Sequence, residues 1–184
     1  GIRLTGFPGV LKTYRMTASQ MEKEISRRNL HVITISFGGP ANDPAQHGRV
    51  IAGAREAMNF LKIFGADRLV VFPPGRMKPG TDVEAGFKAM CECFNRIGEA
   101  AGEMGFKAGV HNHLDEMVEG PEEVHKCMAM TDPRLFHFSP DTAHLHLAGC
   151  NVVEMYQKYK HRIMFMDYKD AKWTTPSEDL VLDN

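Results

Sequence analysis

Long apolar runs are missing from the 184-residue chain: nowhere does it offer the roughly 20 consecutive apolar residues that a membrane-spanning helix needs. Its first residues, "GIRLTGFPGV", lack the basic and then apolar pattern of a signal peptide. An excess of charge of one sign is also missing, since the net charge is −1 at pH 7. A dedicated nucleic-acid binder usually carries a basic face, so we expect neither a membrane nor a nucleic acid among the partners.

Cysteine is scarce, and its spacing is uninformative for metal binding. The four cysteines are Cys91, Cys93, Cys127 and Cys150. The two close neighbours lie two positions apart in a helical pattern, where such residues point to different faces. This arrangement predicts neither a disulfide framework nor a zinc knuckle. We therefore expect free thiols and a reducing, cytoplasmic location.

What the chain does have is a regular series of apolar, β-branched runs that end in turn signals. Five of these runs cover residues 31–37, 68–75, 106–113, 135–141 and 162–170. Residues 1–7 resemble them and count as a sixth. Each run predicts a β-strand.

Helical patterns separate these runs. Between Val83 and Met104 apolar residues recur at alternating spacings of four and three, which predicts a helix with one buried face. Thr17 with Gln20, and Thr81 with Glu84, have the spacing of capping boxes at helix starts. Alternating strands and helices with short connections imply right-handed crossovers and parallel strands.

Two architectures fit this alternation: a doubly wound open sheet and a (β/α)8 barrel. The glycine-rich GxGxxG loop of a dinucleotide-binding sheet is absent, because the first strand-to-helix turn reads "FGGP". This favours the TIM-barrel type, which typically needs about 250 residues. We therefore expect an α/β protein with one domain over residues 1–184, built as an incomplete barrel of about six βα units with the first and last units missing.

Titratable residues crowd the stretch "GVHNHLDEMVEG", at the end of the predicted strand 106–113. His111 and His113 are two apart on a strand, so both side chains point to the same side. Glu119 follows in the loop. Charged groups of this kind are seldom needed to hold a sheet together, so we expect a binding function.

The next two predicted strands end in the same way. Asp141 is followed by His144 in "PDTAHLHLAG", and Asp167 and Lys169 share a face of the last strand. The C-terminal ends of parallel strands lie on one rim, so these groups should converge there. Converging carboxylates repel one another unless a cation neutralises them. Oxygen ligands with one or two imidazoles suit Mn²⁺, Mg²⁺ or Co²⁺.

These motifs carry a resemblance to a known family. "GVHNHLDEMVEGPEEV", "DTAHLHLAG" and "MDYKDA" resemble the strand-five, strand-six and strand-seven motifs of the xylose isomerase-like barrels, and are closest to the sugar phosphate isomerase/epimerase and inosose dehydratase branch. The resemblance covers nearly the whole chain, from the second family strand to the seventh. It is specific in the second half and architectural in the first.

The resemblance implies one divalent metal, Mn²⁺ first and Mg²⁺ or Co²⁺ as alternatives. Its implied ligands are Glu119, Asp141 and Asp167, with Asp167 standing where the family motif "H-x-K-D" has histidine. The family's strand-eight glutamate has no counterpart, since the sequence ends in "SEDLVLDN". Either the chain is a fragment or another subunit completes the barrel. His144 matches the family histidine that contacts substrate oxygens.

Simpler roles remain open for the same residues. Asp141 also suits a helix N-cap, and Glu119 suits the first turn of a helix. Asp167 and Lys169 could form a plain ion pair; in the functional interpretation Lys169 neutralises the site or meets a substrate oxygen. One of His111 and His113 is expected to contact substrate or to support the ligands.

The function implied by the resemblance is that of a metal-dependent isomerase or epimerase acting on a sugar or polyol. A proton next to a carbonyl is removed to give an enediolate, with the catalytic groups drawn from His111, His113, His144 and Lys169. A dehydratase acting on a keto-sugar or inosose shares this first step and is the alternative.

A hypothesis of another class is a non-catalytic binding or partner subunit on a barrel scaffold. DNA repair chemistry, also found in the superfamily, would need more histidine ligands and a basic rim. The expected partners are a small sugar or cyclitol and either a second copy of the chain or a completing subunit.

Overall fold

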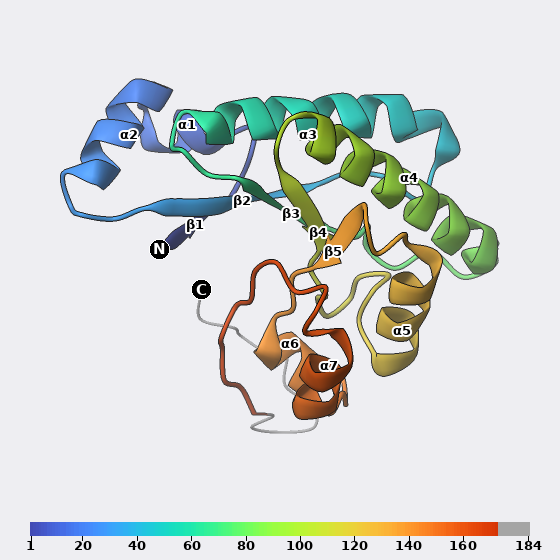
Figure 1. Ribbon diagram of the computed structural model, residues 1–184. Helices are drawn as coiled ribbons and strands as arrows, with labels where there is room; N and C mark the ends of the chain where they lie inside the picture. The colour runs from blue at the N-terminus through green and yellow to red at the C-terminus, as the bar shows by residue number, and fades with distance from the viewer. Residues whose placement is uncertain (173–184) are drawn as a thin grey trace.

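The computed structural model describes residues 1–172 of the chain, as one parallel sheet with helices between its strands (Figure 1). The sheet order is β1-β2-β3-β4-β5. The strands are β1 (Ile2–Leu4), β2 (Val32–Gly38), β3 (Arg68–Phe72), β4 (Lys107–Val110) and β5 (Phe136–Phe138). The helices are α1 (Val10–Tyr14), α2 (Ala18–Ser26), the 3-10 turn η1 (Pro44–Gln46), α3 (His47–Lys62), α4 (Val83–Glu103), α5 (Pro121–Met130), α6 (Thr142–Leu147) and α7 (Val152–Tyr159).

Five of the six expected strands are present, and all are parallel. The sixth expected strand, residues 162–170, is not regular. It runs parallel to β5 and makes two isolated bridges, Phe138 with Ile163 and Asp141 with Asp167. Asp141 lies three residues after Phe138, whereas Asp167 lies four residues after Ile163, so the second segment holds one extra residue between the two bridges. This extra residue interrupts the ladder, as a β-bulge does.

The sheet is curled. In a flat sheet with strands about 4.8 Å apart, β1 and the segment beyond β5 would lie roughly 24 Å from each other. Instead Arg3 of β1 lies 2.8 Å from Asp167 of that segment, measured from Nη1 to Oδ2. An arginine side chain cannot bridge the flat-sheet distance, so the two edges have turned toward each other. This is the curvature of a barrel wall and confirms the expected architecture.

The core lies between the sheet and the long helices α3 and α4, which run side by side along its outer face (Figure 1). On α4 the expected stripe is buried at Phe87, Met90, Phe94 and Ile97, but Val83 is 53% exposed. Phe94 stacks on Phe136 of β5 with ring centroids 4.8 Å apart.

Close packing of α4 on the sheet depends on a glycine. A Cβ atom at Gly98 would lie 2.4 Å from the Leu135 carbonyl oxygen.

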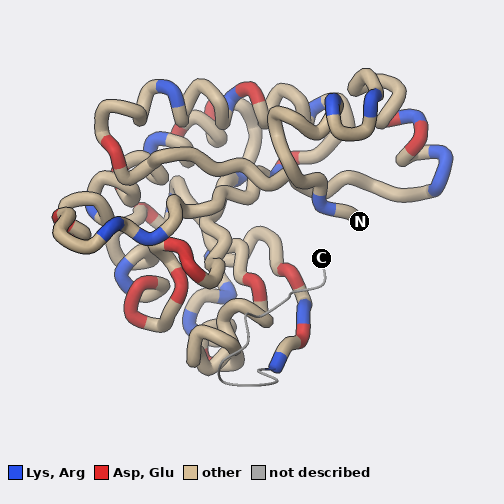
Figure 2. The backbone as a smooth tube through the Cα atoms, turned by 180° about the vertical axis from the view of Figure 1, so that it is seen from behind, with Lys and Arg blue, Asp and Glu red and all other residues tan. Residues whose placement is uncertain are grey.

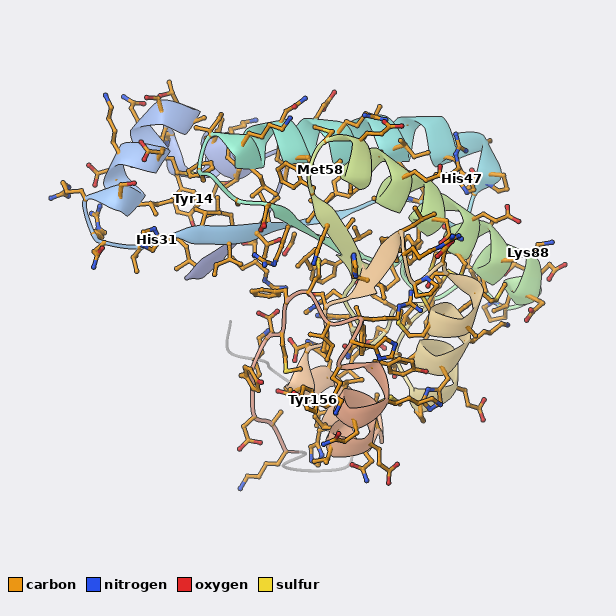
Figure 3. The ribbon with its side chains drawn as sticks, viewed as in Figure 1. Tyr14, His31, His47, Met58, Lys88 and Tyr156 are labelled. Carbon is orange, nitrogen blue, oxygen red and sulfur yellow. The ribbon has the colours of Figure 1, made fainter. Side chains whose placement is uncertain are left out.

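Elsewhere, Met58 of α3 is completely buried, whereas Tyr14 and Tyr156 are exposed (Figure 3).

One of the two expected capping boxes is confirmed. The Thr17 side chain accepts from the Gln20 N–H, and the Gln20 side chain accepts from the Thr17 N–H. The box at Thr81 was wrong by one residue: α4 is capped by Asp82, whose carboxylate accepts from the Ala85 N–H. Aspartate is the stronger N-cap, so the helix begins one position later.

Charge and hydropathy add two observations. Lys and Arg residues are interspersed with Asp and Glu along the backbone (Figure 2). Among the described residues, no helix combines the length and the apolar character that crossing a bilayer requires. All four cysteines are free thiols, as expected, and all four are buried. Residues 177–184, where the strand-eight glutamate was sought, lie outside the described part of the chain.

Candidate metal centre

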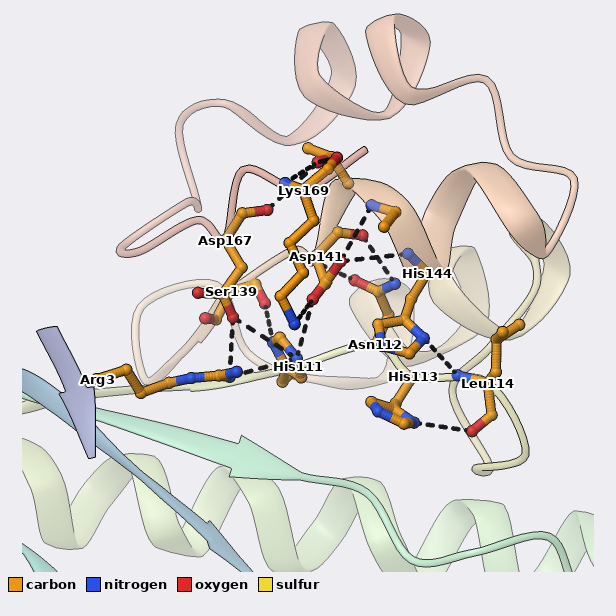
Figure 4. Close-up of polar contacts among 12 residues, drawn as sticks. Arg3, His111, Asn112, His113, Leu114, Ser139, Asp141, His144, Asp167 and Lys169 are labelled. Carbon is orange, nitrogen blue, oxygen red and sulfur yellow. Dashed lines mark hydrogen bonds and ion pairs between the residues drawn. The ribbon is translucent and has the colours of Figure 1, made fainter. Parts of the chain in front are cut away.

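Three ligand atoms converge where the last three strand-like segments end. His111 follows β4, Asp141 follows β5, and Asp167 lies in the segment beside β5 (Figure 4). Their ligand atoms all lie within 4.8 Å of one another. His111 Nε2 is 3.7 Å from Asp141 Oδ2 and 3.8 Å from Asp167 Oδ2. The strand ends thus bring together one imidazole and two carboxylates.

His111 presents a nitrogen without a proton to this centre. Its Nδ1 lies 3.0 Å from the Ser139 carbonyl oxygen, which can only accept, so Nδ1 carries the ring proton. Burial, and next the positive charge of Arg3, lower the pKa of His111 to about 3. The ring is therefore neutral at pH 7, and the Nε2 lone pair faces the carboxylates. Metal-binding histidines usually show this pattern, with the other nitrogen donating to a carbonyl.

Asp141 divides its two oxygens between two tasks. Oδ1 caps α6 by accepting from the N–H groups of Ala143 and His144, at 3.0 and 3.2 Å. Oδ2 points into the centre, 3.1 Å from Lys169 Nζ. Burial alone would raise the pKa of Asp141, but the hydrogen bond from the His144 N–H and the positive charge of Lys169 outweigh it and leave the pKa below its ordinary value. Of the two roles posed for Asp141 from the sequence, the N-cap is present, and it leaves Oδ2 of the same carboxylate facing His111.

Asn112 fixes the backbone that carries Asp141. Its Oδ1 accepts from the Asp141 N–H at 3.0 Å, and its Nδ2 donates to the Asp141 carbonyl at 3.4 Å. Both residues are completely buried. The "N" of "HNH" was not singled out from the sequence. The sequence signal was partial: alternation places Asn112 on the face opposite its flanking histidines, but it does not identify Asp141 as its partner.

Asp167 is held by Arg3 from the opposite edge of the sheet. The ion pair spans 2.8 Å, and Arg3 Nη1 is also 3.4 Å from His111 Nε2. Burial raises the pKa of Asp167, while Arg3 acts in the opposite direction. No pattern in the sequence pointed to Arg3, because its partner depends on how far the sheet curls.

The donor set fits a divalent cation. One neutral imidazole nitrogen and two carboxylate oxygens are ligands that Mn²⁺ and related ions accept. Within residues 1–172, the Oδ2 atoms of Asp141 and Asp167 are buried and accept no geometrically sound hydrogen bond. Arg3 and Lys169 supply the compensating charge. Buried acceptors without donors are costly, and a cation bound among them removes that cost.

Two further histidines lie beside the centre. The rings of His113 and His144 have centroids 3.7 Å apart. His113 Nδ1 lies 2.9 Å from the Leu114 carbonyl, so it donates, and its Nε2 is left as an acceptor. His144 Nδ1 accepts from the Leu114 N–H at 3.3 Å, so its Nε2 carries the proton. Burial, then the charge of His113, lower the pKa of His144 to about 4.

A cavity of about 620 Å³ adjoins the centre. It is lined by Arg3, Thr5, Ser36, Phe72, His111, His113 and Lys169. His111 and His113 thus share one side, as the alternation predicted. The size is that of a small-molecule site.

Glu119 is the one expected ligand that the structure does not bring to the centre. Its Oε2 accepts from Arg76 Nε and Nη2, at 3.0 and 2.7 Å, and from the Asp115 N–H at 2.8 Å. The loop after β4 carries it to the start of α5, where an arginine from the loop after β3 neutralises it. His111, expected to be catalytic, lies with Asp141 and Asp167 instead.

Comparison with known proteins agrees with this architecture. Residues 4–181 match the model of the family described as xylose isomerase-like TIM barrel. An inosose dehydratase from Bacillus velezensis is 29% identical over 168 residues, which are 84% of this chain and 55% of the relative. One from Clostridium botulinum is 27% identical, over 92% of this chain and 61% of the relative.

Solved structures show the same fold at low identity. The IOLI protein with a bound zinc atom has a TM-score of 0.73 and 16% identity, covering 90% of this chain and 61% of its own. An L-ribulose 3-epimerase has a TM-score of 0.69 and 14% identity, covering 90% and 58%.

The chain thus spans somewhat more than half the length of the proteins it matches. With the family model matching residues 4–181, the chain belongs to the xylose isomerase-like TIM barrel family.

Proposed function

We propose that this chain carries the metal centre of an enzyme that removes a proton next to the carbonyl of a sugar or cyclitol. The observation that carries the proposal is the convergence of three potential ligand atoms, on His111, Asp141 and Asp167, beside a cavity of about 620 Å³. The relatives named inosose dehydratase act, by name, on a keto-cyclitol. Mn²⁺ is the first candidate metal, with Mg²⁺ and Co²⁺ as alternatives. A bound divalent cation would polarise the substrate carbonyl and make the neighbouring C–H more acidic.

The chain's own residues supply the proton transfers. His113 lines the cavity, and its Nε2 is free to accept the proton from the carbon next to the carbonyl. Lys169 lines the same cavity and carries a proton that it can give to an oxygen of the substrate. His144 holds the Leu114 backbone and so fixes the loop on which His113 is oriented. His144 therefore acts as a positioning residue in this proposal.

Elimination of water is the favoured outcome. The C–H proton goes to His113, the electron pair of that bond forms a carbon–carbon double bond, the carbon–oxygen bond at the next carbon breaks, and Lys169 protonates the departing hydroxide to give water. The names of the sequence relatives favour this outcome over isomerisation. Isomerisation or epimerisation begins with the same proton removal and differs only in where the proton returns, so it stays the second candidate.

Metal binding can be tested by isothermal titration of the chain with Mn²⁺ and by elemental analysis. Asp167→Asn removes one ligand charge at nearly constant shape, and Asp170→Asn is the matched control because Asp170 is exposed close by. We expect about one Mn²⁺ per chain in the parent and the control, and binding weaker by about tenfold or more in Asp167→Asn. Equal binding in all three would contradict the centre.

Proton removal can be tested in D₂O with an inosose, following the signal of the hydrogen next to the ketone by NMR. We expect its loss to depend on Mn²⁺ and on His113, with His137→Gln as the control histidine. Formation of an unsaturated ketone would identify dehydration, and exchange without net loss of water would identify isomerisation or epimerisation.

A non-catalytic role is favoured by one observation: Arg3 and Lys169 already pair with the two carboxylates. A chain that binds neither Mn²⁺ nor inosose would support a binding or partner subunit on a barrel scaffold.

A further inference from the structure

A second cavity, of about 640 Å³, opens at the C-terminal ends of β2 and β3. Phe72, the last residue of β3, lines both this cavity and the one beside the metal centre. The two spaces therefore adjoin along one side chain. Asn42, Thr81 and Glu116 are among the polar residues that line the second cavity.

Glu116 is set into this wall by a short backbone pairing between two loops. It forms an antiparallel bridge with Gly75 of the loop after β3. The Arg76 N–H donates to the Asp115 carbonyl at 3.0 Å, and the Met117 N–H donates to the Pro74 carbonyl at 2.9 Å. These bonds flank Glu116 on both sides, so its position does not depend on its own side chain.

One oxygen of the Glu116 carboxyl group lacks a hydrogen-bond partner. Its Oε2 is buried and has no hydrogen-bond partner in the described part of the chain. Two basic residues line the same cavity, Arg76 and Lys78, yet within residues 1–172 neither forms an ion pair with Glu116. Arg76 is engaged by Glu119 instead. Burial raises the pKa of Glu116 to about 8, so near neutral pH the group carries a proton and can donate.

We propose that Glu116 is a substrate-binding residue that donates a hydrogen bond to a hydroxyl of the cyclitol or sugar, on the part of the ring that extends past Phe72 into the second cavity. The inference rests on the proposed function for the substrate class. A polyol supplies hydroxyl oxygens that accept as well as donate, which suits a buried carboxyl without a partner. Leaving such a group unmatched disfavours any ligand that lacks the hydroxyl, so Glu116 contributes to selectivity.

The test measures inosose affinity by calorimetry at pH 6.5 on the Mn²⁺-loaded chain. Glu116→Gln keeps a donor at the same place, whereas Glu116→Leu removes it. Glu122→Gln is the matched control, because Glu122 is exposed at the start of α5. We expect a loss of about tenfold in Glu116→Leu, and affinities within about threefold of the parent in Glu116→Gln and in the control.

Each outcome is decisive. Parent-like inosose binding by Glu116→Leu overturns the inference and leaves the proposed function standing. A loss in Glu116→Leu accompanied by an equal loss of Mn²⁺ binding assigns the residue a structural role and also overturns it. If the parent binds Mn²⁺ but no inosose, the proposed substrate class and this inference fail together. Should Glu116→Leu not fold, Glu116→Met removes the donor with a more flexible side chain and takes its place.

Discussion

Arg3, on the first strand, forms an ion pair with Asp167, in the segment beyond the last strand. The pair joins the two edges of the curled sheet, and it places Nη1 of Arg3 3.4 Å from Nε2 of His111. Both partners are largely shielded from solvent, with side chains 15% and 14% exposed. Arg3 therefore stabilises the curled sheet. It also neutralises the negative charge of Asp167, which would otherwise attract a metal ion.

Replacing Arg3 should separate these two effects. Arg3→Gln removes the cation, so we expect the chain without metal to lose about 1–2 kcal/mol in free energy of unfolding. Mn²⁺ should bind more tightly, because a positive charge has left the centre. Urea unfolding and Mn²⁺ titration measure the two quantities. Arg49→Gln, an exposed change on α3, should alter neither. Weaker Mn²⁺ binding in Arg3→Gln would show that the guanidinium helps to assemble the ligands.

The two tasks of Asp141 can be told apart by two substitutions. Asn serves as an N-cap about as well as Asp, whereas Ala does not. We expect Mn²⁺ binding to weaken by about tenfold or more in both variants. Asp141→Ala should be less stable than Asp141→Asn by about 1 kcal/mol, measured by urea unfolding without metal. Equal stabilities would mean that the cap of α6 contributes nothing measurable.

Asn112 should matter through the backbone of Asp141. Asn112→Ala leaves the Asp141 N–H and carbonyl without their buried partners, which costs about 1–3 kcal/mol of stability. The carboxylate would no longer be aimed, so Mn²⁺ affinity should fall by about tenfold. Asn59→Ala, on the exposed face of α3, is the control. A stability loss with unchanged metal affinity would limit Asn112 to a structural role.

The raised pKa of Glu116 predicts a pH-dependent cost to stability. A carboxyl whose pKa rises from 4.5 unfolded to about 8 folded binds its proton more tightly in the folded state. Its ionisation therefore destabilises the fold progressively between these pH values, and the cost is full above about pH 8. Glu116→Gln cannot ionise. We expect the two proteins to be similarly stable at pH 4 and the variant to gain about 1–3 kcal/mol relative to the parent by pH 9. A difference that does not change with pH would show that the group titrates normally.

Much of the fold followed from local patterns. Apolar runs predicted all five regular strands, and the spacing of Phe87, Met90, Phe94 and Ile97 predicted the buried face of α4. The sixth strand was only partly right, because pattern alone cannot count residues across a ladder. The extra residue between Ile163 and Asp167 appears only once both segments are paired.

The candidate site was predictable as a place but not as a set of contacts. Strand ends located His111, Asp141 and Asp167 together, because parallel strands share a rim. The direction of Glu119 could not be predicted, since it depends on Arg76 from another loop. Glu116 was missed for a related reason: burial of a loop carboxyl is a property of the assembled loops and has no signature in its neighbours along the chain.

The irregular pairing beside β5 has a consequence for how this family can vary. Counted from the bridge between Phe138 and Ile163, Asp141 lies three residues on and Asp167 four, so strict alternation in both segments would place the two carboxylates on opposite faces. The irregular pairing absorbs this difference, and both carboxylates lie beside His111. Deleting one residue between Ile163 and Asp167 would give three steps on each side and a regular ladder, in which Asp167 would still lie opposite Asp141. The segment can therefore lose its irregularity without losing the pair of carboxylates.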